Sequence, residues 1–133
     1  KIIFWKNQVT FIENNFMDQK TPLSIDPKEL KEWLSEDPSK ILLVDVREEE
    51  ELAIASIDKP VIHFPLSQSL SWSKTFPEYL SFDKPIVVFC HSGIRSLRFG
   101  IWLLEQDERY QVWNLRGGID AWSLDVDNSI MRY

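Results

Sequence analysis

An uninterrupted apolar run from Ile86 to Phe89 ends directly at Cys90, the only cysteine among the 133 residues. A short polar loop containing Gly93 follows, and apolar residues then recur at helical spacing. This order predicts a buried strand that places a cysteine at its carboxyl end, followed by a turn into a helix. Backbone N–H groups of such a turn, a helix N-terminus and a nearby cation would stabilise a nucleophilic thiolate. Without such neighbours, a buried cysteine at a strand end is inert.

Further apolar runs rich in β-branched residues predict strands at 41–46, 61–64 and 111–115. Asp26, Pro27 and Glu29 form a helix start with Asp26 as the cap, and Pro38 forbids continuation of that helix. Short helices are expected over 47–54 and from 119, a longer amphipathic helix over 94–104, and one or two helical turns within 67–82. Alternating strands and helices predict an α/β domain with a largely parallel sheet.

Residues 1–20 do not fit this alternation and are treated as an N-terminal extension of unknown role, which leaves one domain over 21–133. No apolar run approaches the roughly 20 residues that span a membrane. The compartment stays open, with a soluble cytoplasmic or organellar location favoured over secretion.

Charge and composition exclude several classes of function. The net charge of −6 argues against general nucleic-acid binding, which needs a basic surface to neutralise phosphates. A single cysteine excludes a disulfide within the chain and also excludes an internal resolving thiol. His63 and His91 share no ligand spacing with Cys90, so we expect no metal site.

Polar and glycine residues follow three of the predicted strands. Asp45 and Arg47 come at the end of the first, Cys90 after the next, and Arg116 with Gly117 after the last. In an open α/β sheet, ligands bind outside the carboxyl ends of the strands. We therefore expect these residues to share one face of the sheet.

Three segments resemble the rhodanese-like sulfurtransferase family: Val44-Asp45-Val46-Arg47-Glu48, Cys90-His91-Ser92-Gly93-Ile94-Arg95-Ser96, and Leu115-Arg116-Gly117-Gly118-Ile119-Asp120-Ala121-Trp122. They occur in the family's order and spacing, and the resemblance covers about residues 22 to 133. It implies a mostly parallel five-stranded sheet with helices on both faces. It also implies that the cysteine carries a transferable sulfane sulfur as a transient persulfide, with no other cofactor.

By this resemblance Cys90 is the catalytic nucleophile that takes sulfur from a small donor such as thiosulfate. The active-site loop would bind the substrate through His91, Ser92, Gly93, Ile94, Arg95 and Ser96. Arg95 would bind the anionic end of the donor or keep Cys90 ionised, and packing of the loop against the sheet is the alternative role. Supporting roles fall to Asp45, to Arg47 paired with a carboxylate such as Glu51, and to Arg116 and Gly117 as the pocket wall.

Two other functions stay open. Related cysteine phosphatases place five residues between the cysteine and the arginine of the loop, whereas four separate Cys90 from Arg95. The shorter loop makes a smaller cradle, better suited to sulfur than to phosphate. The second alternative is a scaffold or regulatory binding module that keeps the fold without catalysis. If the chain is an enzyme, the missing second cysteine requires an external acceptor: a thiol, cyanide or a sulfur-acceptor protein.

Overall fold

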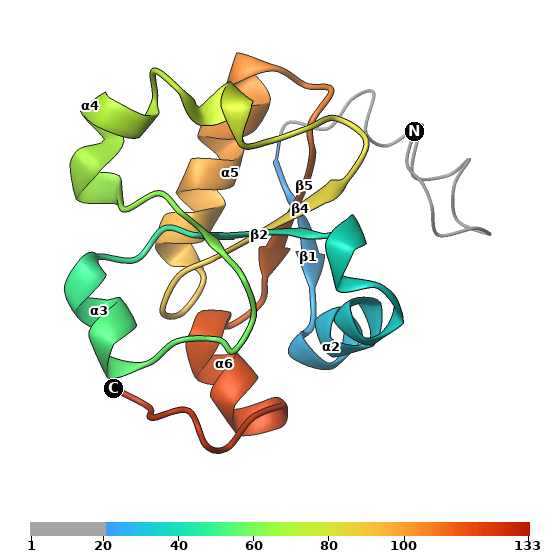
Figure 1. Cartoon of the computed structure of the whole chain (residues 1–133), viewed down its shortest axis with the longest axis vertical. Coiled ribbons are helices and arrows are strands. Elements are labelled where there is room, and N and C mark those ends of the chain that lie inside the picture. The colour runs from blue at the N-terminus through green and yellow to red at the C-terminus, as the bar shows by residue number, and fades with distance from the viewer. Residues whose placement is uncertain (1–20) are drawn as a thin grey trace.

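The computed structural model describes residues 21–133, and the extension predicted over 1–20 lies outside the described residues. Within 21–133 a single sheet has the strand order β1-β5-β4-β2-β3, and every pair of neighbours runs parallel (Figure 1). The strands are β1 (Leu23–Ile25), β2 (Leu42–Asp45), β3 (Ile62–His63), β4 (Pro85–Phe89) and β5 (Gln111–Leu115). The expected α/β fold with a five-stranded parallel sheet is confirmed.

Five α-helices and three 3-10 turns connect these strands in the described part of the chain. The helices are α2 (Pro27–Glu36), α3 (Glu49–Ile54), α4 (Ser69–Trp72), α5 (Ile94–Gln106) and α6 (Gly118–Asp125). The 3-10 turns are η2 (Pro38–Lys40), η3 (Leu66–Gln68) and η4 (Phe76–Glu78). As the sequence predicts, α2 ends before Pro38 and the segment 67–82 contains only short helical turns.

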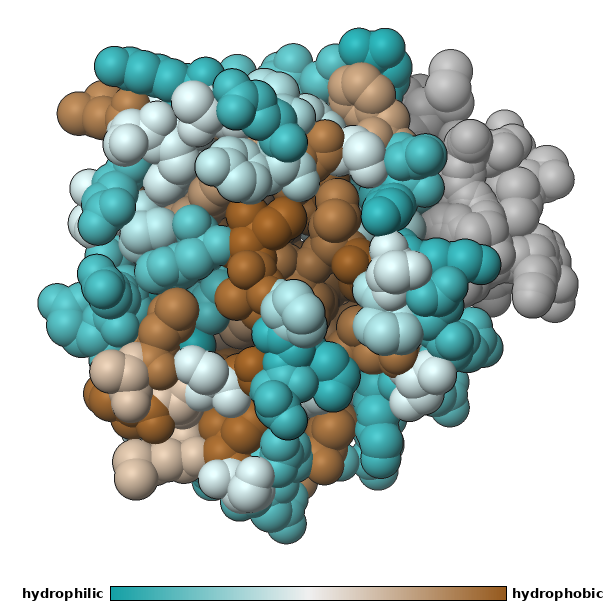
Figure 2. All heavy atoms as spheres, viewed as in Figure 1, coloured by the Kyte–Doolittle hydropathy of each residue, from teal (hydrophilic) through white to brown (hydrophobic). Residues whose placement is uncertain are grey.

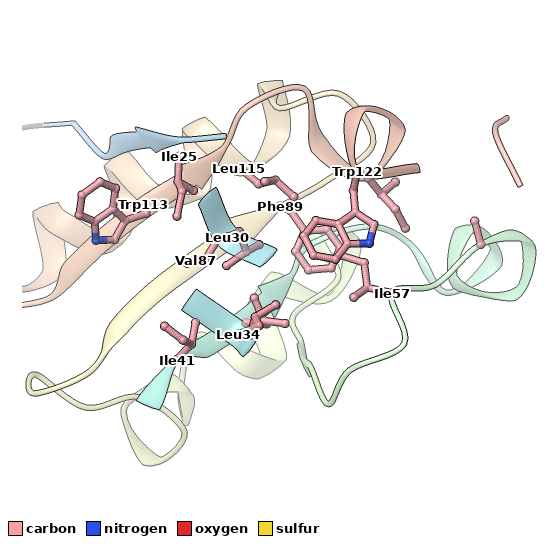
Figure 3. Packing of buried hydrophobic residues seen from close by; sticks show 13 residues of the cluster. Ile25, Leu30, Leu34, Ile41, Ile57, Val87, Phe89, Trp113, Leu115 and Trp122 are labelled. Carbon is pink, nitrogen blue, oxygen red and sulfur yellow. The ribbon is translucent and has the colours of Figure 1, made fainter. Parts of the chain in front are cut away.

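Helices cover both faces of the sheet, and each face has its own hydrophobic cluster (Figure 1). Val87 and Phe89 of β4 point to the face packed against α2 and α6, which Figure 3 shows from close by. Ile86, Val88 and Cys90 belong to the opposite cluster, under α5. Because the side chains of a strand alternate between faces, both faces of β4 are buried, which explains its unbroken apolar run.

The strands differ from the sequence prediction at the two edges of the sheet. β1 is not among the strands predicted from the residues, because its three positions include a serine and are too short to show a period. The strand predicted over 61–64 is shortened to Ile62–His63, between Pro60 and Pro65. Proline lacks the N–H that a ladder needs, and the edge strand therefore stops there.

An apolar groove of about 490 Å³ opens at the amino-terminal ends of β2 and β3. Figure 2 shows apolar side chains gathered around a hollow near the middle of this face of the molecule. The apolar groove is lined by residues that include Leu34, Pro38, Ile41, Leu43, Val61 and Ile62. Since Cys90 follows the carboxyl end of β4, the groove lies at the other end of the parallel strands from the cysteine.

Candidate active site

Cys90 lies at the carboxyl end of the central strand β4, where its side chain is only 1% exposed. Its Sγ accepts hydrogen bonds from the backbone N–H of Gly93, at 3.1 Å, and of Ser96, at 3.4 Å. The Ser96 hydroxyl lies 3.3 Å from the same sulfur. The loop therefore surrounds the sulfur with donors, an arrangement that stabilises negative charge.

Local backbone geometry explains why these donors reach the sulfur. Gly93 has φ 110°, in the left-handed region that favours glycine, and it immediately precedes α5. The first N–H groups of a helix have no partner inside the helix. Ser96 lies in this first turn, so its N–H is free to point at Cys90.

The glycine turn after β5 packs directly against the active-site loop. The N–H of Ile119 donates to the Cys90 carbonyl at 2.9 Å, and the N–H of Asp120 donates to the His91 carbonyl at 3.1 Å. A Cβ added at Gly118 would lie 2.4 Å from the His91 carbonyl oxygen and 2.5 Å from that of Cys90. Only glycine allows α6 to approach the loop this closely.

Replacing Gly118 with alanine is expected to lower the free energy of unfolding by about 1–3 kcal/mol, because backbone atoms must shift and φ is +62°. Gly93→Ala is the matched control, since it also has positive φ but its Cβ would meet no atom closer than 3.6 Å. Urea unfolding of both variants measures the difference. Equal losses would mean that the backbone conformation, and not close approach to the loop, makes Gly118 necessary.

Arg95 of the loop forms a two-pronged ion pair with Glu51 of α3. Its Nη1 and Nη2 donate to the two carboxylate oxygens at 2.7 and 2.9 Å. Glu51 also accepts from the N–H of Glu48 and from the hydroxyl of Tyr133. These bonds, that of Arg95 foremost, lower the pKa of Glu51 from 4.5 to about 2, and Glu51 in turn raises the pKa of Arg95. Glu51 therefore ties the active-site loop to α3.

This ion pair predicts acid sensitivity. Because the pKa of Glu51 is lowered on folding, its stabilising effect is fully present above pH 4.5 and is lost as the pH falls toward 2. Arg95 is 35% exposed, so solvent limits the effect to roughly 1–2 kcal/mol. Glu51→Gln should be less stable than the unchanged protein at neutral pH, and the difference should shrink below pH 4.5. Denaturant unfolding between pH 2.5 and 7 measures it.

The exposed Glu50 of the same helix provides the control for this measurement. Glu50→Gln should follow the unchanged protein across the whole pH range. A stability gap for Glu51→Gln that does not depend on pH would contradict the assigned ion pair.

Asp45 and Arg47 form a buried ion pair at the end of β2. Arg47 Nη2 lies 2.9 Å from Asp45 Oδ2, and neither side chain is more than 3% exposed. Arg47 also donates to the backbone carbonyls of Glu51 and Ala55. Arg47 pairs with a carboxylate, as predicted, but with that of Asp45, the last residue of β2. Glu51, the carboxylate named in the prediction, is engaged by Arg95. The pair joins the end of β2 to the backbone carbonyls of Glu51 and Ala55.

The remaining residues of the predicted loop differ in environment. Ser92 is exposed and Ile94 is 62% exposed. The His91 ring stacks on Tyr133, with centroids 4.2 Å apart, and its buried Nε2 has no hydrogen-bond partner among the described residues. The structure thus brings Gly93 and Ser96 to the sulfur, while the side chains of His91 and Arg95 bind other parts of the chain.

The two predicted pocket-wall residues are placed differently. Gly117 lies beside the loop, since its N would be 3.6 Å from a Cβ added at Gly93. The Arg116 side chain is exposed and pairs with Asp26. Asp26 is the N-cap residue of α2, as predicted, but its carboxylate makes no cap bond and pairs with Arg116.

Sequence reasoning missed Asn114, whose amide contacts both Gly93 and Ser96. The available signal was a polar residue close to the carboxyl end of a predicted strand, Gln111–Leu115. Tyr133, which bonds Glu51 and Arg47, was also missed, since a lone tyrosine far along the chain carries no such signal.

Among the described residues, no group of three or more histidine, cysteine, aspartate or glutamate side chains is placed to hold a metal ion. Likewise, none of the helices within residues 21–133 is long and apolar enough to cross a membrane.

Comparison with protein families gives one match that covers most of the chain. The Rhodanese family model, described as a rhodanese-like domain, matches residues 26–125. A "Rhodanese-like/PpiC domain-containing protein 12, chloroplastic" from Arabidopsis thaliana is 41% identical over 91 residues. That alignment covers 68% of this chain but only 30% of the plant protein.

Two further proteins match over most of their own length. "Thiosulfate sulfurtransferase GlpE" of Haemophilus influenzae is 33% identical over 81 residues, which cover 61% of this chain and 71% of that protein. The crystal structure of a rhodanese-related protein from Thermoplasma volcanium superposes with a TM-score of 0.59 at 29% identity, covering 78% of this chain and 93% of that one.

Proposed function

Since this chain belongs to the rhodanese-like domain family, we propose that it is a sulfurtransferase that moves a sulfane sulfur through a persulfide on Cys90. The observation that carries the proposal is the convergence of two backbone N–H donors, from Gly93 and Ser96, on a buried sulfur. Donors fixed in this way stabilise a charged sulfur without reorganising during the reaction. No other cofactor is needed for this chemistry.

The reaction has two balanced steps. The Cys90 thiolate attacks the outer sulfur of a donor such as thiosulfate, the sulfur–sulfur bond of the donor breaks, and sulfite leaves with the bonding electrons. Cyanide or an acceptor thiolate then attacks the outer sulfur of the persulfide. This second step forms thiocyanate or an acceptor persulfide and returns the Cys90 thiolate.

An external acceptor is required because no other cysteine is present in the 133 residues. A small thiol or a sulfur-acceptor protein would serve in this role. Thiosulfate is proposed as the donor because a relative from Haemophilus influenzae carries that activity in its name.

Arg95 supports this chemistry from a fixed position. Its guanidinium is held by Glu51, so its charge stays near the loop without donating a hydrogen bond to the sulfur. We assign it the role of holding the loop and favouring negative charge at Cys90. The donor's anionic end would meet this same positive charge as it approaches.

Intact-mass measurement tests the proposal. After incubation with thiosulfate the protein should gain the mass of one sulfur atom, peptide mapping should place it on Cys90, and cyanide should remove it with release of thiocyanate. Failure to form the adduct at any pH between 6 and 9 would leave the fold as a scaffold or binding module.

Incubation with an aryl phosphate tests the remaining alternative, that the protein is a cysteine phosphatase. The loop with four residues between Cys90 and Arg95 predicts no turnover of this substrate. Sustained hydrolysis that depends on Cys90 would replace the proposed sulfur transfer with phosphatase activity.

A further inference from the structure

Asn114 connects two parts of the active-site loop. It is the second-to-last residue of β5, half-buried, and its amide faces the sulfur-binding turn. Its Nδ2 donates to the Gly93 carbonyl at 3.1 Å. Its Oδ1 lies 2.6 Å from the Ser96 hydroxyl. Because a carbonyl oxygen can only accept, the amide nitrogen must face Gly93, and the amide oxygen must therefore face Ser96.

This orientation decides where the Ser96 proton points. The hydroxyl has one proton and two neighbours, Asn114 Oδ1 at 2.6 Å and Cys90 Sγ at 3.3 Å. Two acceptor oxygens 2.6 Å apart would repel each other, so the proton must lie between Ser96 and Asn114. The hydroxyl then presents a lone pair to the sulfur. A lone pair matches a neutral thiol, whose S–H can donate to it, and opposes a thiolate.

We propose that Asn114 is a positioning residue that aims the Ser96 hydroxyl away from Cys90, so that less thiolate forms than if the hydroxyl donated to the sulfur. When the thiol proton leaves to solvent, the hydroxyl stays bonded to Asn114 and gives the thiolate no third donor. The backbone N–H groups of Gly93 and Ser96 stay on the sulfur in both states. This inference rests on the proposed sulfur transfer, because that reaction starts from the thiolate.

Within residues 21–133, Asn114 hydrogen-bonds Gly93 and Ser96 and none of the charged or titratable groups near Cys90. Arg95 of α5 interacts electrostatically with Cys90 and is itself paired with Glu51 of α3. The groups on the other surrounding segments are His91 of the loop, the Asp45–Arg47 pair after β2, Asp120 of α6, and Tyr133. Variants at Asn114 therefore leave these charged groups in place and change two contacts, with the Ser96 hydroxyl and with the Gly93 carbonyl.

Two substitutions in the full chain separate this role from simple bracing of the loop. Ultraviolet absorbance of the thiolate, titrated against pH and corrected with Cys90→Ala, reports ionisation of the single cysteine. Asn114→Leu removes the competing acceptor, and we expect about a fivefold higher ratio of thiolate to thiol at a given pH. Asn114→Asp keeps an acceptor for Ser96 and adds negative charge near the sulfur. In this variant, Cys90 should ionise at higher pH than in the unchanged protein.

The two variants are informative because both lose the bond from Asn114 Nδ2 to Gly93. If that brace were the only role of Asn114, both would loosen the loop and ionise at higher pH, which would overturn the proposal. If Asn114→Leu fails to fold, as judged by circular dichroism, Asn114→Ala takes its place because it removes the same polar atoms. Its Cys90 should again ionise at lower pH than that of Asn114→Asp.

A second test asks whether Asn114 acts through Ser96. In a Ser96→Ala background the hydroxyl is absent, and adding Asn114→Leu should leave the ionisation unchanged. If Asn114→Leu still makes Cys90 ionise at lower pH in the Ser96→Ala background, the proposal is overturned. The titration needs no sulfur donor, so it can succeed or fail independently of persulfide formation and thiocyanate release.

Discussion

Replacing Cys90 with serine is expected to reduce thiocyanate formation from thiosulfate and cyanide by roughly a thousandfold or more. A serine hydroxyl stays protonated near neutral pH and cannot hold a sulfur atom as a persulfide. The N–H groups of Gly93 and Ser96 would remain in place but would have no anionic sulfur to stabilise. The measurement is the initial rate of thiocyanate release at saturating thiosulfate.

The serine variant must be shown to be folded for this result to count. Cys90 is buried in the cluster under α5, and an oxygen in place of the sulfur lowers stability only modestly, so circular dichroism should show an unchanged fold. A variant that is folded and retains more than a tenth of the rate would show that Cys90 is not the sulfur carrier.

Removing the Arg47 guanidinium is expected to cause the largest loss of stability. Arg47→Met would leave the Asp45 carboxylate buried without its cation, which costs about 3–5 kcal/mol. The Ala55 carbonyl would also lose the Arg47 donor, and the Glu51 carbonyl would keep the N–H of Ala55. Urea unfolding followed by tryptophan fluorescence measures the free energy of unfolding.

The exposed pair Arg109–Asp107 offers a matched control. Its side chains are 70% and 29% exposed, so solvent screens the charges, and Arg109→Met should lower the free energy of unfolding far less than Arg47→Met. Adding Asp45→Asn to Arg47→Met should recover part of the loss, because the unpaired charge is then removed. Equal losses for Arg47→Met and Arg109→Met would show that the buried pair is not a main source of stability.

The sequence allowed prediction of those parts of the fold in which the local pattern and tertiary packing agree. β4 and β5 are buried on both faces, so their apolar runs predicted the bounds of both strands to within a residue or two. β1 has only three residues and is held by pairing with β5, a contact between distant parts of the chain. No local pattern can reveal a strand that depends on such a partner.

The same distinction applies to the candidate site. Cys90, Gly93 and Ser96 are close in sequence, and their arrangement follows from a strand, a turn and a helix start. The partners of the arginines could not be predicted in this way. Glu51 is only four residues from Arg47, but its carboxylate binds Arg95. The guanidinium of Arg47 is instead paired with the carboxylate of Asp45 at the buried end of β2.

Asn114 and Gly118 lie about 20 to 30 positions after Cys90, yet they are part of the support of its loop. The amide groups of Ile119 and Asp120, which bind the loop carbonyls, also lie in the last fifth of the sequence. Because the chain is synthesised from its amino-terminal end, β4 and α5 exist before β5 and α6 do. A nascent chain that has formed β4 and α5 but not yet β5 and α6 therefore holds the cysteine without this support. Capacity to accept sulfur should consequently arise only once β5 and α6 have been synthesised and have packed against the loop.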